Sequence, residues 1–310
     1  MDIRQLRTFH RVAVLGSFTR AAAELNYAQS SVTAQIKNLE VSLGSDLFER
    51  VGGKVKLTPA GTRLLPYAGQ MLSLADEARG AASPDAQPEG VLTIGTMESI
   101  TSYRMPAVLE YFHHRYPRLQ IALRPSLCAE TLHSLRQGVF DAGFLMEAET
   151  QHSGVHSEVL GTEELVVVAS PEHRLAHEVK VATDDLRLES VLAPEAGCAY
   201  RELLEAELND GSGEPVPFLE FGNVEAIKRG VGAGLGVSLL PRMTVLDELA
   251  SGALVPLAWE VPFVLYTQLA WRKGAQLSRE RQVFVEKVID FLSREYQEGQ
   301  ARSRSESQGA

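Results

Sequence analysis

Three helix-length patterns fill the first 43 residues, and only short turns separate them. Apolar residues recur at helical spacing over 3–15, and Gly16 stops that pattern. Ser17 suits the N-cap of a second helix over 18–25, which is built on three consecutive alanines. A third pattern runs over 28–43. Two helices joined by so short a turn predict a helix-turn-helix.

A short hairpin and a long helix follow. Residues 47–50 and 54–57 flank Gly52-Gly53, so they predict two strands joined by a glycine turn, which form a wing. Thr58-Pro59 supplies an N-cap followed by proline at the first helical position. The helix that begins there carries a narrow, heptad-like apolar stripe of Leu64, Ala68, Met71, Ala75, Ala78 and Ala82. Such a stripe favours pairing with the same helix of a second chain. The alternative is a helix packed on its own domain.

Residues 81–90 are small and rich in proline, which predicts a hinge and the main domain boundary. Beyond it, short apolar strands alternate with helical stretches, an order typical of an α/β domain with a mostly parallel sheet. The expected strands are 91–95, 119–124, 142–145, 165–170, 191–193, 236–240 and 265–271. The expected helices are 100–115, 129–137, 200–208, 224–231 and 278–296. The small polar residues 299–310 predict a disordered tail.

The charge of the chain is unevenly distributed. The 310 residues have a formal net charge of −10, which by itself argues against a nucleic-acid partner. Residues 1–65, however, hold nine basic and five acidic side chains, whereas the remainder has a net charge of about −14. A basic module attached to an acidic body favours nucleic-acid binding by the first part.

The sequence also bears on the compartment. Met1 to Leu6 contain no apolar signal-peptide core, and the longest apolar runs, such as Leu165–Ala169, are far too short to cross a bilayer. Two cysteines, Cys128 and Cys198, make no disulfide framework. We therefore expect a cytoplasmic chain with no membrane partner.

Three blocks in the first 61 residues form a dense set of sequence motifs. The first comprises Leu6, Phe9, Val12, Ala13, Gly16, Ser17, Phe18, Thr19, Ala21, Ala22 and Leu25. The second comprises Ser30, Ser31, Val32, Thr33, Gln35, Ile36, Leu39, Glu40, Leu43, Gly44, Leu47, Phe48 and Arg50. The third is Leu57, Thr58, Ala60 and Gly61. Together these blocks closely resemble the N-terminal region of LysR-type transcription regulators. Weaker family marks continue to about residue 295, among them Pro106, Tyr116-Pro117, Gly138, Asp141 and the run 233–241.

The resemblance implies a bacterial transcription regulator and not an enzyme. It implies a winged helix-turn-helix over 1–58, a linker and dimerisation helix with its hinge over 59–89, and an effector-binding domain over 90–298. That domain would be periplasmic-binding-protein-like, with one α/β subdomain over 91–161 and 267–298 and a second over 162–266. Such regulators are usually homotetramers that bind an interrupted inverted repeat in double-stranded DNA, and RNA polymerase is a further expected partner.

The polar face of the third helix is the expected DNA-reading surface. Its apolar stripe faces the core, so Gln29, Ser30, Thr33 and Lys37 lie largely opposite. Gln pairs with adenine, and Ser and Thr reach phosphate or base edges. On the wing, Arg50, Lys54 and Lys56 are expected to contact phosphate. The resemblance adds Thr19 and Ser31 and puts the start of this helix in the major groove.

One departure from the family limits what carries over. Many relatives carry proline at position 30 or 31 and arginine at 34, where this chain has Ser30-Ser31 and Ala34. The missing arginine removes a base or phosphate contact, so the bases that this chain reads do not carry over.

A small-molecule effector is expected in the cleft between the two subdomains, beside strand ends and helix N-termini. In the first subdomain the candidate residues are Thr96, Ser99, Ser126 and Cys128, and by resemblance Cys128 occupies a position that is often a pocket threonine. In the second they are Cys198, Tyr200, Arg201, Phe221 and Asn223. Helix N-termini and Arg201 favour an anionic effector, whereas Glu98 opposes a second negative charge or holds an amine. The sequence therefore leaves open whether the effector is an anion or a cation.

Other functions have weaker sequence support. Cys128 and Cys198 allow a redox-sensing regulator if they meet across the cleft. The histidine pairs 113–114 and 152/156 lack the Cys/His clusters of strong metal sites, so no metal or other cofactor is expected. The glycines over 232–236 precede a strand instead of joining a strand to a helix, which argues against a nucleotide loop and an enzyme.

Overall fold

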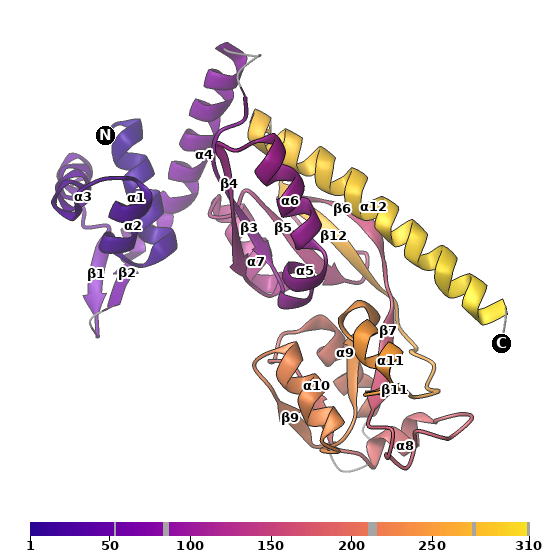
Figure 1. Ribbon diagram of the computed structural model, residues 1–310. Coiled ribbons are helices and arrows are strands. Elements are labelled where there is room, and N and C mark those ends of the chain that lie inside the picture. The colour runs from indigo at the N-terminus through magenta and orange to yellow at the C-terminus, as the bar shows by residue number, and fades with distance from the viewer. Residues whose placement is uncertain (53, 83–86, 210–215, 275–276, 309–310) are drawn as a thin grey trace.

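The computed structural model describes residues 1–52, 54–82, 87–209, 216–274 and 277–308. A small N-terminal domain is joined by the long helix α4 (Pro59–Ala82) to a larger C-terminal domain of two α/β subdomains (Figure 1). Helix α12 (Arg279–Gln308) lies along the first subdomain and leads to the C-terminus. Within the predicted hinge, residues 83–86 lie outside the described part of the chain.

The N-terminal domain contains three helices and a hairpin: α1 (Ile3–Leu15), α2 (Phe18–Glu24), α3 (Gln29–Leu43), β1 (Phe48–Val51) and β2 (Lys54–Leu57). Local caps set the helix ends. The Ser17 side chain accepts a hydrogen bond from the Arg20 amide at the start of α2, and Gly44 ends α3 with φ 66°, which only glycine adopts readily. The predicted helix-turn-helix and wing are therefore both present.

Helix α4 has two apolar faces. Leu65 and Ala68 are buried in the core of the N-terminal domain, against α1. Tyr67, Met71 and Leu74 are exposed on the other side. The predicted stripe therefore combines residues from both faces, because Ala68 packs within its own chain whereas Met71 does not. The exposed face is the part of α4 that remains available to a second chain.

The first subdomain is a five-stranded sheet in the order β4-β3-β5-β12-β6. Its strands are β3 (Gly90–Thr96), β4 (Leu119–Pro125), β5 (Ala142–Glu147), β6 (Val155–Glu163) and β12 (Leu265–Arg272). Besides α12, its helices are α5 (Glu98–Tyr103), α6 (Met105–Arg115) and α7 (Cys128–Gln137). The chain leaves this sheet after β6 and returns to it in β12.

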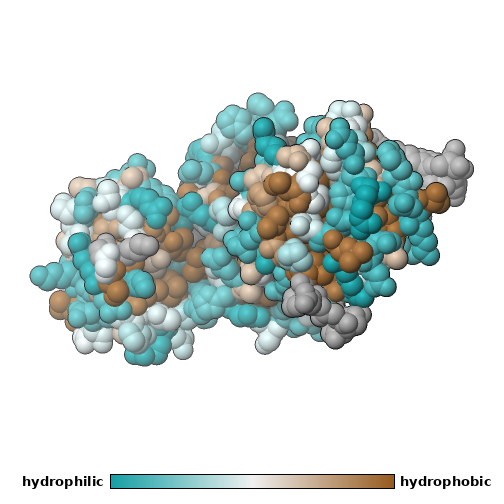
Figure 2. Space-filling view, turned by 90° about the horizontal axis from the view of Figure 1, so that it is seen from below, coloured by the Kyte–Doolittle hydropathy of each residue, from teal (hydrophilic) through white to brown (hydrophobic). Residues whose placement is uncertain are grey.

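The second subdomain is built between those two crossings. It contains β7 (Leu165–Ala169), β8 (Val191–Ala193), β9 (Phe218–Glu220), β10 (Ser238–Pro241) and β11 (Val255–Pro256). Its helices are α8 (Thr183–Arg187), α9 (Ala199–Leu208), α10 (Val224–Gly232), a 3₁₀ turn (Arg242–Thr244) and α11 (Leu246–Ser251). Viewed from below, apolar side chains gather in several patches on the larger lobe of the molecule (Figure 2).

Three sequence expectations differ from the structure. The five-stranded sheet is mixed, because β12 runs antiparallel to β5 and β6, and the three-stranded sheet is antiparallel throughout, because β7 runs antiparallel to β10 and β11. The helix expected over 100–115 is two helices that break at Arg104, directly before Met105-Pro106, because proline does not continue a helix. The tail expected to be disordered over 299–310 continues α12 as far as Gln308.

A buried polar cluster lies where the chain crosses between the subdomains. Glu163, at the end of β6, is 5% exposed and accepts hydrogen bonds from Tyr296 (2.7 Å) and Thr267 (3.0 Å). Arg104 lies 3.3 Å from Glu163 and 2.6 Å from Glu295. A buried carboxylate with this many donors is fully satisfied. The cluster ties α5, α6 and α12 to the crossing strand.

The two domains touch where α1 and α4 meet the end of α7. Nε2 of His10 donates a hydrogen bond of 2.7 Å to the carbonyl of Gly138. A Cβ on Gly69 would lie 3.2 Å from the Cα of Gly138, so α4 approaches α7 backbone to backbone. Arg11 adds a hydrogen bond of 3.2 Å to Thr93 of β3.

Candidate nucleic-acid interface and ligand cleft

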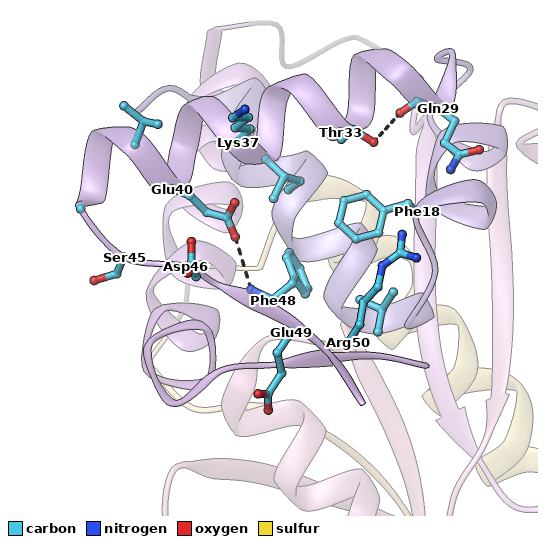
Figure 3. A pocket seen from close by; sticks show the side chains of 14 residues that line it. Phe18, Gln29, Thr33, Lys37, Glu40, Ser45, Asp46, Phe48, Glu49 and Arg50 are labelled. Atoms are coloured by element: carbon cyan, nitrogen blue, oxygen red, sulfur yellow. Dashed lines mark hydrogen bonds between the residues drawn. The ribbon is translucent and has the colours of Figure 1, made fainter. Parts of the chain in front are cut away.

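A groove of about 590 Å³, with polar and apolar side chains in its lining, lies between α3 and the hairpin (Figure 3). Gln29, Thr33 and Lys37 line it from α3, and Arg50 lines it from β1. Phe18 of α2 closes one side. The other side of α3 packs into the core, since Val32 and Leu39 are fully buried and do not line the groove. The helix therefore places Gln29, Thr33 and Lys37 along the groove, away from the core, as the sequence pattern predicted.

The predicted DNA-binding residues whose side chains the structure describes are all exposed. Exposed side chains belong to Thr19, Gln29, Ser30, Ser31, Thr33, Lys37, Arg50 and Lys56. Of these, Thr19, Ser30, Ser31 and Lys56 do not line the groove. The side chain of Lys54 lies outside the described part of the chain. Exposed donors without apolar cover suit contacts to phosphate and base edges.

Side chains outside the predicted DNA-binding set hold the wing against α3. Glu40 of α3 accepts hydrogen bonds from the amides of Leu47 (2.8 Å) and Phe48 (3.4 Å). The Phe48 ring lies 5.4 Å from that of Phe9 and 5.6 Å from that of Phe18. Aromatic pairs at these distances are typical of stable packing. The carboxylate and the rings thus fix the position of the hairpin relative to α3.

A second, smaller cavity of about 80 Å³ lies between the two subdomains of the C-terminal domain. It is bounded by α5 and the start of α7 on one side and by the starts of α9 and α10 on the other. Its apolar lining includes Met97, Leu127, Met146, Pro194, Tyr200 and Phe221. A largely apolar cavity with a few convergent polar groups is typical of a small-molecule site.

The structure brings six of the nine predicted effector residues to this cavity: Ser99, Cys128, Cys198, Tyr200, Phe221 and Asn223. The other three do not line it. Thr96 is fully buried beneath it, and Ser126 forms a hydrogen bond of 2.7 Å with Thr131. Arg201 bonds to Glu205 (2.7 Å) and Glu220 (2.6 Å), so its guanidinium is occupied outside the cavity.

The two thiols face the same cavity from opposite subdomains. Cys128 begins α7 and accepts a hydrogen bond from the Met146 amide at 3.4 Å, whereas Cys198 caps α9. Burial raises the pKa of each thiol to about 11. Both are therefore protonated at neutral pH, and neither has the depressed pKa of a reactive thiol.

Two side chains of α5 cross the junction between the subdomains. Oε2 of Glu98 accepts a hydrogen bond of 3.0 Å from the amide of Val224, the first residue of α10. The hydroxyl of Tyr103 donates to Glu225 at 3.2 Å and accepts from Lys228 at 3.2 Å. The structure is therefore closed across the cavity by polar contacts.

The described part of the chain offers neither a cluster of metal ligands nor a membrane-spanning helix. No group of three or more His, Cys, Asp and Glu side chains in that part of the chain is arranged to hold a metal ion. No described helix combines the length and apolar character needed to span a bilayer.

A winged helix-turn-helix joined to a two-subdomain α/β module with a cavity at its junction defines a DNA-binding transcription regulator with an effector-binding domain. Residues 3–62 match the model of the lysR-family bacterial regulatory helix-turn-helix proteins, and residues 85–293 match the LysR substrate-binding domain. The chain therefore belongs to the LysR family of regulators, which are not enzymes.

Individual relatives agree with this assignment. The chain is 38% identical over 287 residues to the uncharacterized HTH-type transcriptional regulator YwqM of Bacillus subtilis (strain 168), covering 92% of this chain and 98% of the relative. A full-length OxyR variant from Pseudomonas aeruginosa has a TM-score of 0.74 at 25% identity, covering 94% of each chain. LysG of Corynebacterium glutamicum, solved with bound effector Arg, has a TM-score of 0.61 at 25% identity, covering 94% of this chain and 98% of LysG.

Proposed function

We propose that this regulator reads an interrupted inverted repeat in promoter DNA through α3, and that a small molecule in the cavity between the subdomains switches promoter activity. The observation that carries the proposal is the pairing of two surfaces in one chain. One is the exposed polar face of α3 beside the wing, and the other is a half-enclosed cavity at a junction of two subdomains. The first suits DNA and the second suits an effector.

In the DNA-bound state, Gln29 and Thr33 reach base edges while Lys37, Arg50 and Lys56 contact phosphate. All five side chains are exposed, and the first four line the groove beside the wing. Thr19, Ser30 and Ser31 add contacts at the ends of α2 and α3, where backbone N–H groups face the phosphates. Base contacts supply sequence choice and phosphate contacts supply affinity.

The DNA half is tested by footprinting the full-length chain on bound genomic fragments and by measuring the affinity of single variants. Gln29→Ala is expected to weaken specific binding about tenfold, since a good bidentate pair contributes roughly 1–3 kcal/mol. Asn38→Ala is the matched control, because Asn38 is exposed on α3 but does not line the groove. Equal affinity of the Gln29→Ala variant and the wild type for the operator would remove Gln29 from the reading surface.

Effector binding acts through the polar contacts that close the cavity. Ser99 and Cys128 line the cavity from the first subdomain, and Tyr200 lines it from the second. A ligand bound between them changes the balance between the closed and the open arrangement of the subdomains. LysG, a structural neighbour, was solved with bound effector Arg. Ser99→Ala is expected to leave the footprint in place and to shift the effector dose-response curve to higher concentration. An unchanged curve would exclude Ser99 from the site.

Assembly and partners follow the same proposal. The exposed apolar face of α4, with Tyr67, Met71 and Leu74, pairs with its copy in a dimer. Two dimers form a tetramer in the cytoplasm, span two half-sites and contact RNA polymerase at the promoter. Sedimentation of the wild type and of Leu74→Glu tests the dimer, which the added charge should dissociate.

A redox switch is the second candidate, favoured because Cys128 and Cys198 face one cavity from opposite subdomains. A disulfide would lock the cavity shut. The raised pKa of both thiols opposes it, because the thiolate is the reacting species. DNA binding that responds to hydrogen peroxide in the wild type but not in Cys128→Ser would favour the redox switch over the effector.

A further inference from the structure

The cavity between the subdomains carries negative charge without a compensating cation. Its charged lining residues are Glu98 and Glu195, and no lysine, arginine or histidine is found among the described residues that line it. Arg201, one of the predicted effector residues, is held outside the cavity by its ion pairs with Glu205 and Glu220. The charged side chains that a ligand meets here are therefore carboxylates.

The protein's own carboxylate also occupies the end of α10. The amide of Val224 donates its hydrogen bond to Oε2 of Glu98 from the opposite subdomain. A ligand carboxylate would have to displace Glu98 to reach this N–H group and would then lie beside it. Two like charges at such a distance are unfavourable, so an anionic ligand is disfavoured twice.

One polar group in the cavity is ready for a ligand. Ser99 is 5% exposed and lines the cavity, and its hydroxyl has no hydrogen-bond partner among the described side chains and backbone groups. The lining of the same cavity also includes two methionines and the rings of Tyr200 and Phe221. Aromatic faces attract a cation and methionine adapts to apolar tails of different shape.

The volume limits the size of the occupant. A cavity of 150 Å³ holds benzene, so the roughly 80 Å³ between the subdomains suits an apolar tail of roughly three to five non-hydrogen atoms. Larger effectors would need the subdomains to open.

Resting on the function proposed above, we infer that the effector is a small primary amine with a short apolar tail and no carboxylate. Its ammonium group lies between the carboxylate of Glu98 and the hydroxyl of Ser99, and its tail lies among Met97, Met146 and Phe221. Glu98 keeps its bond to Val224 and accepts a second donor on its remaining lone pairs. The amine thereby strengthens the contact that holds the subdomains together.

Three ligands of equal length separate charge from shape: n-butylamine, 1-butanol and butyrate. Their binding to the full-length chain is measured by calorimetry at pH 7, where the amine is protonated. In the wild type, n-butylamine is expected to bind at least tenfold more tightly than butyrate, with 1-butanol between them, since about tenfold corresponds to one charge interaction of ordinary size. Equal or tighter binding of butyrate overturns the inference.

The matched variants assign the preference to one residue. Glu98→Gln keeps the shape and an acceptor for the Val224 amide, so it should fold and lose the preference for the amine. Glu130→Gln removes a carboxylate from the first turn of α7 that does not line the cavity, and it should behave as the wild type. An unchanged amine preference in Glu98→Gln also overturns the inference.

The outcomes separate this inference from the function on which it rests. If butyrate binds best and Ser99→Ala abolishes that binding, the cavity is an effector site of another chemical class, and only the inference fails. If none of the three compounds binds, the inference fails as well, whereas the footprint still tests DNA recognition independently.

Discussion

The groove beside α3 and the cavity between the subdomains are assembled in opposite ways. The groove draws all its lining from 18–55, a single stretch of neighbouring helices and strands. The cavity is lined from 97–99, 127–128, 146, 194–200 and 221–224, which meet only when two subdomains close. The first surface depends on one folded domain, whereas the second depends on how two subdomains meet. The proposed DNA contacts therefore need the N-terminal domain alone, and the proposed effector contacts need the closed junction.

The largest expected effect is the loss of stability when a buried ring is removed from one of the two hydrophobic cores. Phe9 is fully buried in the N-terminal domain, in a cluster distinct from the core of the C-terminal domain. Phe9→Ala should lower the free energy of unfolding of the N-terminal domain by about 3–5 kcal/mol. Urea unfolding, followed together with ligand binding, measures both regions in one sample.

The control for that variant is Phe284→Ala, which removes a fully buried ring from the other core. Each variant should impair only its own domain. Loss of cavity function in Phe9→Ala at temperatures where the C-terminal domain stays folded would show that the cores are not independent.

A somewhat smaller effect is expected from acid. Burial, with a contribution from Arg11, lowers the pKa of His10 to about 4, whereas an unfolded histidine titrates near 6.5. The folded chain therefore favours neutral His10. Stability from this group is complete above pH 6.5 and is lost as the pH falls, with a total loss of about 3 kcal/mol near pH 4. Urea midpoints at pH 7 and pH 4.5 measure the slope.

His10→Gln should flatten that slope while keeping a donor toward the Gly138 carbonyl. The two thiols of the cavity behave differently, because burial raises their pKa to about 11 and they stay protonated in this range. An identical acid slope in the wild type and the variant would assign the sensitivity to other groups.

The smallest effect concerns a single phosphate contact. Lys56→Ala should weaken binding to all DNA sequences by a similar factor and reduce the slope of log K against log salt by about 1. Gln29→Ala should instead change which sequences are preferred. Lys180→Ala, an exposed lysine of the second subdomain, is the charge-matched control. A change of sequence preference in Lys56→Ala would place that lysine on a base.

What the sequence predicts well is decided within a few residues. The ends of α1, α2 and α3 follow from Gly16, Ser17 and Gly44, whose effects are local. The exposed face of α3 follows from the spacing of its apolar residues in the same way. The exposed side of α3 was therefore predictable from local pattern, whereas the bonds from Glu40 to two backbone amides of the wing were not.

The cavity was predicted only in part, because tertiary contacts decide it. Arg201 follows the expected strand and was a reasonable ligand residue, yet Glu205 and Glu220 draw it away. The sequence leaves the role of Glu98 open, because its hydrogen-bond partner at the start of α10 is distant in the chain. The mixed sheet has the same cause, since β12 returns from the second subdomain and its direction depends on that excursion.

The contact between Gly69 and Gly138 joins the end of α7 directly to α4. This helix of 10 residues, about 15 Å long, begins with Cys128 at the cavity and ends against the backbone of α4. Side chains between two elements absorb small displacements, and no side chain separates the two backbones at this contact. One end of this helix therefore lies in the lining of the cavity, and the other lies against α4, which carries the DNA-binding domain.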